Sequence, residues 1–358
     1  MRKANDSIFL AGQFSPGALG LSYKRAFEAI GVRISTFDLR TSRQNLGWLM
    51  RNRLIHRLTI RNYFIRSVSA RAFNQQLETE VLRSGAQVLF VLTLEFVFPE
   101  TLQNLRQRGV RVVSFYPDNP FPPHYNARPE TLAAARETDL CLIWSEKLVR
   151  RLQEAGVSNP AFLPFAWDPE VFPYQGDRPQ GIWPGVLFLG GWDRQREVFL
   201  EKLARQVPLR IYGPGYWGTR TRPFSRVRRC WQGKELMLAD AAQVIRESAI
   251  CLNVLRRQHI ANGEPDGMIM RHFEVPGAGG FLLSTRGGGA TTLFPEGDSG
   301  EYFSGVEECA EKINKYMGNT SARRDLSERA HALIAARHQY RDRALEIMRL
   351  LDDLPARG

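Results

Sequence analysis

Short apolar runs alternate with segments of helical periodicity along the whole chain, and no other feature of the sequence constrains the fold as strongly. The apolar runs are rich in Val, Ile, Leu and Phe and have the length of buried strands. In the first half we expect strands at 7–11, 33–37, 87–93, 111–115, 140–145 and 161–164, with helices between them that include 19–30, 100–108 and 146–155. This order predicts right-handed βαβ units around a parallel sheet.

The alternation stops once and then resumes. Residues 168–185 carry four prolines and are typical of a linker between domains. Beyond it we expect strands at 186–190, 209–212, 249–254 and 280–284, with helices at 195–206, 239–247, 268–276, 305–317, 320–335 and 340–351. The pattern predicts an α/β protein made of two Rossmann-like, doubly wound domains that face each other across a cleft. The expected divisions are an N-terminal domain (1–170), a linker (171–184), a C-terminal domain (185–335) and a final helix (336–358), for which packing back on the N-terminal domain is one option.

The charge of the chain points to an anionic partner. Its 358 residues include 49 Lys and Arg against 37 Asp and Glu, a formal net charge of +12. Nucleic acid, acidic lipid and phosphorylated small molecules all fit this balance. The four cysteines lack metal-ligand spacing and predict reduced thiols in a cytoplasmic setting. No apolar run reaches the ~20 residues that a membrane-spanning helix needs, so we expect a soluble protein or one peripheral to a membrane.

The most informative stretch is NGEPDGMIMRHFEVPGAGGFLLS, residues 262–284. Asp266-Gly267 is expected to begin a helix whose first N–H groups face an anion such as a diphosphate. Glu274 lies about two turns further on, where its carboxylate suits the hydroxyl groups of a sugar. A second interpretation needs no ligand: an Asp N-cap and a glycine-rich helix end describe many helices.

The same stretch resembles the sugar-nucleotide-binding segment of GT-B glycosyltransferases, and specifically of the spore-maturation-protein-like (CgeB-type) family. The resemblance rests on Asp266-Gly267, then Arg271-His272-Phe273-Glu274, a small-residue turn and Gly280-Phe281. It extends over nearly the whole chain. Further matching segments are FLAGQFSPGALGLSYKRAFEAIGVRISTFD near the start, YPDNP at 116–120, FLPFA at 162–166, 188–196 with Ile211-Tyr212-Gly213, and HQYRDRA at 338–344.

The resemblance implies transfer of a sugar from a nucleotide-sugar donor, held by the C-terminal domain, to an acceptor on the N-terminal domain. The implied acceptor is a cell-envelope glycan or polysaccharide, a lipid-linked molecule or a protein. By similarity, Glu274 would bind the ribose and Asp266 to Met268 the sugar and diphosphate, with Gly267 and Gly213 in the donor site. Arg196 or Arg271 would neutralise the departing diphosphate. The chain contains no Asp-x-Asp triplet, so neither a metal nor another cofactor is expected. Related retaining enzymes usually carry Glu where this chain has Asp266, and the shorter side chain reaches less far.

Two positions in the N-terminal half are further candidates. Asp118 follows an expected strand end, where catalytic groups of such sheets gather, and suits a base that activates the acceptor; a turn-forming Asp before Asn-Pro is the alternative. The loop with Gly12 and Gly17 either approaches the donor phosphates or serves only as a strand-to-helix turn. It lacks both a GxGxxG and a P-loop pattern.

One segment concentrates positive charge. Between residues 39 and 77 there are eight arginines and no acidic residue. Leucines and a methionine recur every four residues, which predicts an amphipathic helix with Arg53, Arg57 and Arg61 along one flank. Such a helix suits an anionic membrane or an acidic acceptor; a solvated face is the alternative. Nucleic acid is not expected, because no standard nucleic-acid-binding module is present.

A glycosyltransferase is therefore the first functional hypothesis. The alternative from a different class is a glycosyltransferase-like protein without activity, which would serve as a binding or assembly component of a surface-polymer system.

Overall fold

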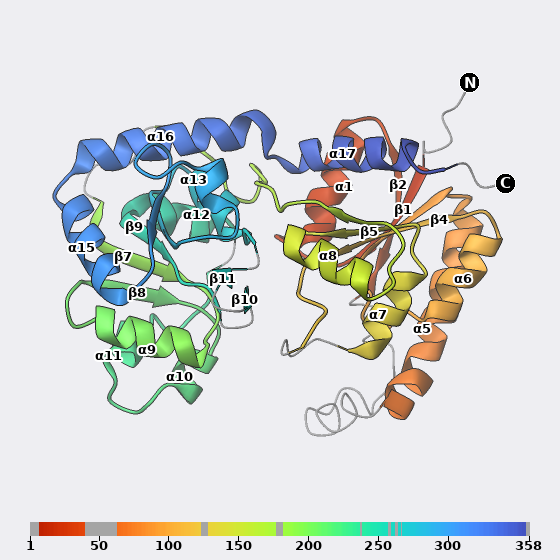
Figure 1. The fold of residues 1–358 in the computed structure, drawn as a ribbon, viewed down its shortest axis with the longest axis horizontal. Coiled ribbons are helices and arrows are strands. Elements are labelled where there is room, and N and C mark those ends of the chain that lie inside the picture. Colours follow the sequence, from red (N-terminus) through yellow and green to blue (C-terminus); the bar gives the residue numbers. More distant parts are fainter. Residues whose placement is uncertain are drawn as a thin grey trace. The chain divides into compact units, whose positions relative to one another are not determined.

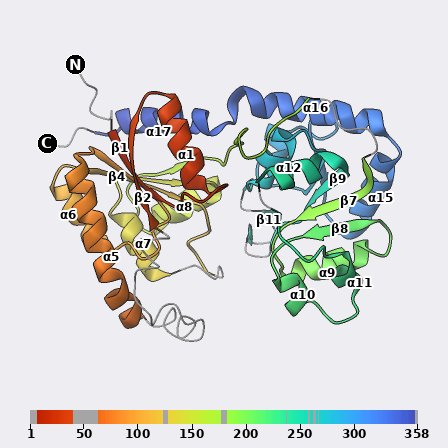
Figure 2. The ribbon, with the colours of Figure 1, turned by 180° about the vertical axis from the view of Figure 1, so that it is seen from behind.

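The computed structural model describes residues 7–39, 63–122, 128–176, 182–236, 238–256, 259–261, 264–265 and 267–355. The chain divides into two compact units. Unit 1 comprises Met1–Pro164 together with Arg341–Gly358, and unit 2 comprises Phe165–Tyr340 (Figures 1 and 2).

Unit 1 is built around a parallel sheet that has six strands within the described residues, in the order β2-β1-β3-β4-β5-β6. The strands are β1 (Ser7–Gly12), β2 (Arg33–Asp38), β3 (Val88–Leu92), β4 (Arg111–Tyr116), β5 (Leu140–Ile143) and β6 (Pro160–Phe162). The helices are α1 (Leu19–Ala29), α5 (Tyr63–Ser84), α6 (Pro99–Gln107), α7 (Pro129–Arg136), α8 (Glu146–Glu154) and α17 (Tyr340–Asp352). Strand β3 is buried along its whole length, as expected for a parallel strand covered on both faces.

Unit 2 repeats the plan with a five-stranded parallel sheet among the described residues, in the order β13-β12-β9-β7-β8. Its strands are β7 (Trp183–Leu189), β8 (Leu209–Tyr212), β9 (Ser248–Asn253), β12 (Leu282–Thr285) and β13 (Glu301–Phe303); β10 (Ile260–Ala261) and β11 (Glu264–Pro265) form a separate antiparallel pair. Its helices are α9 (Arg194–Leu203), α10 (Tyr216–Arg220), α11 (Arg226–Cys230), α12 (Leu238–Glu247), α13 (Arg271–Gly277), α14 (Ala290–Leu293), α15 (Val306–Met317) and α16 (Thr320–Arg337).

Both units have the same strand order when each is counted from its own first strand, 2-1-3-4-5, with one further strand in unit 1. In each unit the order reverses beside the first strand: between β1 and β3 in unit 1, and between β7 and β9 in unit 2. Ligands of open α/β sheets bind at such reversal points, outside the carboxyl ends of the strands. The topology therefore selects one position in each unit for a binding site.

The strands and helices expected from the sequence are present with small changes of boundary, which confirms the α/β class. Elements that were not expected are the 22-residue helix α5, the short helices α10, α11 and α14, and the strands β10, β11 and β13, each of two or three residues and so too short for a pattern. Strand β7 begins at Trp183, inside the segment expected to be a linker, and Val171 and Phe172 of that segment are buried.

The C-terminal helix α17 belongs to unit 1 (Figure 1). Arg111 of β4 donates from Nη1 to the carbonyl oxygen of Leu351 over 2.7 Å. Arg343, almost fully buried, donates from Nε to the carbonyl oxygen of Pro164 over 3.0 Å. None of the described helices is both long and apolar enough to cross a membrane.

Candidate functional site

The reversal point of the unit 2 sheet is formed by the ends of β7 and β9. Strand β7 is followed by Gly190 and Gly191, and β9 by Val254 and Leu255. Because the two strands are parallel neighbours, all four residues lie at the same edge of the sheet. In the sequence the two pairs are some sixty positions apart.

Arg196 joins the two strand ends. Asp193 begins α9 by accepting hydrogen bonds from the backbone N–H of Gln195 (2.9 Å) and Arg196 (3.3 Å). Arg196, 5% exposed, donates from Nε to the carbonyl oxygen of Val254 (2.7 Å) and from Nη1 to that of Gly191 (3.1 Å). Sequence analysis placed Arg196 in the donor site, and the structure places its guanidinium group at the reversal point of the sheet.

Two further arginines lie close to Arg196. The pKa of Arg196 is lowered to about 9, mainly by burial and also by the neighbouring cations Arg256 and Arg271, with Asp193 opposing them. Arg256 passes over Gly191, where a Cβ atom would overlap its Nη2 atom. Arg196 and Arg256 are like charges at one strand edge, and an anion beside them would relieve their repulsion.

Arg256 was not singled out from the sequence. Its position identifies it. Arg256 comes just after the fully buried strand β9, and the neighbouring strand β7 is followed by two glycines. That signal requires knowing that β7 and β9 pair, which the local pattern does not reveal.

Glu274 and Arg271 form an ion pair at the start of α13. Arg271 Nη1 lies 2.8 Å from Glu274 Oε2, and Glu274 is 7% exposed. The structure thus brings together the arginine and the glutamate that sequence analysis assigned to the donor.

The beginning of α13 differs from the expectation. The helix starts at Arg271, not at Asp266-Gly267, and its first backbone hydrogen bonds are accepted by Ile269 and Met270. The physical reason is local: the Ile269 N–H donates to His272 Nδ1 over 3.1 Å, which defines the turn before the helix. Gly267 and Met268 therefore lie in the segment that precedes α13, and Asp266 lies outside the described residues. A Cβ atom at Gly288, in the glycine turn after β12, would lie 2.8 Å from the carbonyl oxygen of Gly267, so these two loops touch.

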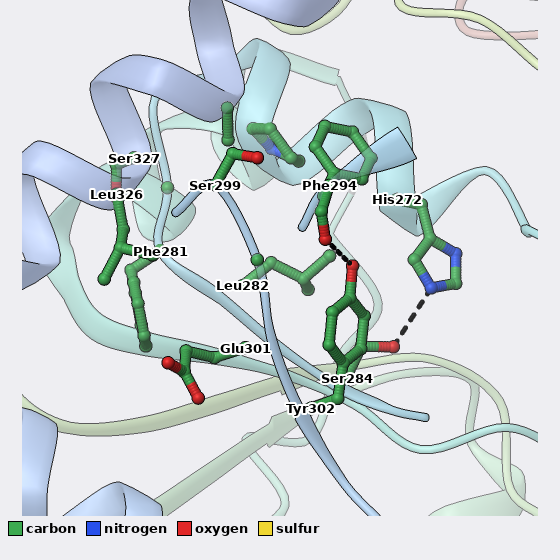
Figure 3. Close-up of a pocket in the computed structure, with 14 residues that line it drawn as sticks. His272, Phe281, Leu282, Ser284, Phe294, Ser299, Glu301, Tyr302, Leu326 and Ser327 are labelled. Atoms are coloured by element: carbon green, nitrogen blue, oxygen red, sulfur yellow. Dashed lines mark hydrogen bonds between the residues drawn. The ribbon is translucent and has the colours of Figure 1, made fainter. Parts of the chain in front are cut away.

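A buried polar network lies beneath α13. His272 Nε2 lies 3.0 Å from Ser284 Oγ, which also accepts a hydrogen bond from Asn253 Nδ2 over 3.0 Å (Figure 3). Burial lowers the pKa of His272 to about 4, so the ring is neutral at pH 7. His272 Nδ1 lies 3.1 Å from the Ile269 nitrogen and 3.2 Å from the Ile269 carbonyl oxygen, so both ring nitrogens are within hydrogen-bond distance of polar neighbours.

A small cavity adjoins this network (Figure 3). Half of its lining residues belong to β12, β13 and α16, and most of the lining, including Phe281, Tyr302 and Leu326, is buried. None of the residues expected to bind the donor lines it. The cavity is thus part of the packing around β12 and is separate from the arginine cluster.

Residues 194–349 match a family model described as glycosyl transferase-like. No curated protein matches the sequence significantly. Sucrose-phosphate synthase from Thermosynechococcus elongatus superimposes with a TM-score of 0.65 at 14% identity, over 98% of this chain and 99% of that one. Anabaena HepE in complex with UDP and glucose gives 0.61 at 15% (97% and 100%), and the trehalose-6-phosphate synthase OtsA gives 0.66 at 13% (98% and 100%).

The fold is GT-B. The similarity extends over both units and confirms the architecture expected from the sequence. At these identities it establishes the fold alone. Within that GT-B fold, the arginine cluster lies in the part of the chain that matches the glycosyl transferase-like model.

Gly213, which the sequence predicted to lie in the donor site, occupies a tightly packed position. A Cβ atom at this position would overlap the carbonyl oxygen of Gly190 and lie 2.7 Å from Trp217 Nε1. Trp217 is fully buried and donates from Nε1 to the same carbonyl oxygen over 2.8 Å. Gly213 therefore permits the close approach of the chain after β8 to the end of β7.

The corresponding edge of unit 1 carries Asp118, Glu95 and Tyr116. Burial raises the pKa of Tyr116, and the carboxylates of Glu95 and Asp118 raise it further, which places all three groups near one another. The loop that carries Glu95 is strained, since Thr93 and Phe96 have φ values of 78° and 68°. Asn74, buried on α5, holds this loop by donating to the Phe96 carbonyl oxygen and accepting from the Phe98 N–H.

Gly12 and Gly17 also belong to unit 1. A Cβ atom at Gly12 would lie 3.0 Å from Leu92 Cδ1, which accounts for a small residue at the end of β1, and Gly17 has a φ of 77° in the turn before α1. Arg53, Arg57 and Arg61 lie outside the described residues. In the described part of the chain, no three His, Cys, Asp or Glu side chains are grouped as metal ligands, and Cys141, Cys230, Cys251 and Cys309 are free thiols.

His272 predicts a pH dependence of stability. Its pKa is near 4 in the folded chain and near 6.5 when unfolded, so the unfolded chain binds the extra proton between these values. The free energy of unfolding should therefore decrease from about pH 6.5 down to about pH 4, by up to ~3 kcal/mol in total. Urea unfolding of the wild type and His272→Gln at pH 5 and pH 7 measures this contribution. Equal pH dependence of the two proteins would contradict it; His331, whose pKa burial also lowers, contributes to both.

Proposed function

We propose that this chain is a glycosyltransferase that takes its sugar from a nucleotide-sugar donor bound at the carboxyl edge of the unit 2 sheet. The observation that carries the proposal is that Arg196 and Arg256 lie together at the reversal point of that sheet, Arg196 bound to both strand ends and Arg256 over Gly191, with the charge of Arg271 also acting on Arg196. A diphosphate is the part of a nucleotide sugar that three guanidinium groups suit, because each offers paired N–H donors to phosphate oxygens. The GT-B neighbour HepE, whose structure is a complex with UDP and glucose, supports a donor of this class.

The proposed chemistry places the arginines where charge develops. As the bond between the sugar and the diphosphate breaks, negative charge grows on the diphosphate, and the acceptor hydroxyl oxygen forms the new bond to the sugar while it loses its proton. Arginine side chains held in place before the reaction stabilise that charge without reorganisation. The proposal assigns this role to Arg196, Arg256 and Arg271, with no metal or other cofactor.

The other residues predicted from the sequence are assigned to parts of the donor and the acceptor. Glu274 is assigned to the ribose hydroxyls, Gly267 and Met268 to the sugar and diphosphate, and Asp266 to the transferred sugar. Gly213, Gly12 and Gly17 shape the loops at the strand ends. Asp118 is assigned to the acceptor side as a base.

The acceptor belongs to unit 1 in this proposal. We infer a cell-envelope glycan or polysaccharide, a lipid-linked molecule or a protein as acceptor, on the motif order shared with the spore-maturation-protein-like (CgeB-type) family. Arg53, Arg57 and Arg61 are proposed as an acceptor or membrane surface.

Two measurements test the proposed glycosyltransferase function: binding of the donor and release of nucleoside diphosphate. We expect UDP-glucose or another nucleotide sugar to raise the melting temperature, because a ligand at 100 times its Kd stabilises a folded protein by ~2.7 kcal/mol. Release of nucleoside diphosphate in the presence of acceptor extracts measures transfer. Stabilisation without turnover would favour an inactive binding protein; no stabilisation by any nucleotide or nucleotide sugar would refute the proposed donor site.

Glu274→Gln tests the assignment to the ribose. A neutral amide loses the charge-assisted hydrogen bonds to the ribose hydroxyls, so we expect the Kd of the nucleoside diphosphate to rise about 10- to 100-fold. Binding of inorganic pyrophosphate, which has no ribose, should change little. Isothermal titration with both ligands measures the difference, and an equal loss for both would show that Glu274 acts only through Arg271.

A further inference from the structure

The segment from α10 to α11 presents an unusual surface in unit 2. Residues 216–229, here called the arginine loop, contain Tyr216, Phe224 and the five arginines Arg220, Arg222, Arg226, Arg228 and Arg229. All five arginines are exposed, and the chain has no acidic residue between Gly213 and Lys234. The loop lies at the end of unit 2 remote from α16 (Figures 1 and 2).

Phe224 at the tip of the loop makes almost no contact with its own chain. Its side chain is 95% exposed and its φ is 63°, a left-handed conformation that a bulky residue adopts only at a cost. Tyr216 is 54% exposed, with the Arg220 guanidinium group 4.3 Å from its ring centroid. A ring this exposed buries almost no apolar surface within the described chain, so it is available for contact with a partner.

The carboxylates nearest the loop are occupied by its backbone. Glu197 accepts from the Arg222 N–H over 3.3 Å, and Glu201 accepts from the N–H groups of Arg226 (3.2 Å) and Val227 (3.0 Å). Ser225 begins α11 by accepting from the Arg228 N–H. These bonds hold the shape of the loop, while none of its five guanidinium groups forms an ion pair with the described residues.

We propose that the arginine loop docks unit 2 on an anionic phospholipid bilayer. Phe224 enters the boundary between headgroups and acyl chains, and the surrounding arginines contact lipid phosphates. Aromatic side chains favour that boundary, and basic residues near an anionic leaflet each add to binding. Two rings, one of them lying against Arg220, do not form the row of aromatic side chains along a groove that single-stranded nucleic acid needs.

Vesicle co-sedimentation of the full chain tests this surface. We expect binding to vesicles of phosphatidylcholine with phosphatidylglycerol, weakening with salt, and little binding to phosphatidylcholine alone. Phe224→Ala should lower the partition coefficient about tenfold through lost apolar burial. The triple variant Arg222→Ala, Arg226→Ala, Arg228→Ala should lower it about 100-fold. The matched control, Arg108→Ala, Arg150→Ala, Arg205→Ala, removes the same charge from exposed positions elsewhere and should change it little.

A second variant separates docking from folding. Phe224→Gly removes the ring and suits the left-handed backbone, so it should keep or raise the melting temperature while membrane binding falls as in Phe224→Ala. Absence of binding to anionic vesicles would overturn the proposal, as would binding that is insensitive to Phe224 or equally sensitive to the control triple. Binding to an oligonucleotide with the same dependence on Phe224 and the three arginines would also overturn it in favour of a general polyanion surface.

Discussion

Arg256→Ala is expected to lower kcat/KM for the nucleotide-sugar donor by about 100- to 1000-fold, the effect of removing one donor that stabilises developing charge. Arg256 lies over Gly191, near the buried Arg196, and follows the end of β9 outside the sheet ladder. The melting temperature of the variant should therefore stay close to that of the wild type. Arg196 is less suited to this test, because its removal also leaves the carbonyl oxygens of Val254 and Gly191 without their partner.

Arg205→Ala is the matched control for Arg256→Ala. Arg205 is exposed just after α9, in the same unit, and its removal changes the net charge by the same amount. Because Arg256 is assigned to the diphosphate, Arg256→Ala should weaken binding of nucleoside diphosphate and of inorganic pyrophosphate alike, unlike Glu274→Gln. Unchanged pyrophosphate affinity in Arg256→Ala would contradict a diphosphate site at this edge of the sheet.

Gly213→Ala is expected to destabilise the chain by roughly 1–3 kcal/mol, as for overpacking in a rigid core. The new methyl group would overlap the carbonyl oxygen of Gly190 and press on the buried Trp217. Neither a backbone carbonyl nor a fully buried indole moves cheaply. The midpoint of urea unfolding measures the loss.

Gly215→Ala, two residues away, provides the comparison. No atom lies within 4 Å of a Cβ atom built at Gly215, and the residue has φ −52° and ψ −10°, which alanine adopts without strain. This substitution should leave stability unchanged or raise it by about 0.4–1 kcal/mol. If Gly213→Ala instead reduced donor affinity without loss of stability, Gly213 would act as a contact for the donor rather than as a packing position.

The secondary structure was largely predictable because each strand and helix has a strong local pattern. Fully apolar segments such as β3 and β9 predicted buried parallel strands, and the structure has them at nearly the same boundaries. Features set by few residues were missed or misplaced: β13 is three residues long, and α13 starts at Arg271 because His272 binds the Ile269 N–H.

The candidate site was predictable only in part. Arg196, Arg271 and Glu274 were named as candidates from the sequence because they belong to segments that resemble known motifs. Arg256 has no motif, and its place in the cluster depends on the pairing of β7 with β9. The exposure of Phe224 could not be predicted from the sequence either, because burial depends on the fold of the whole chain.

The sequence alone determined that this chain folds as parallel α/β layers in two halves, since alternating apolar runs and amphipathic segments bury their surfaces efficiently only in that way. Only the tertiary structure decided the strand order of each sheet and the membership of α17 in unit 1. Strand order depends on how the crossover helices pack and not on any one segment. That order makes neighbours of Arg196 and Arg256, which are sixty residues apart, and so assembles the cationic site.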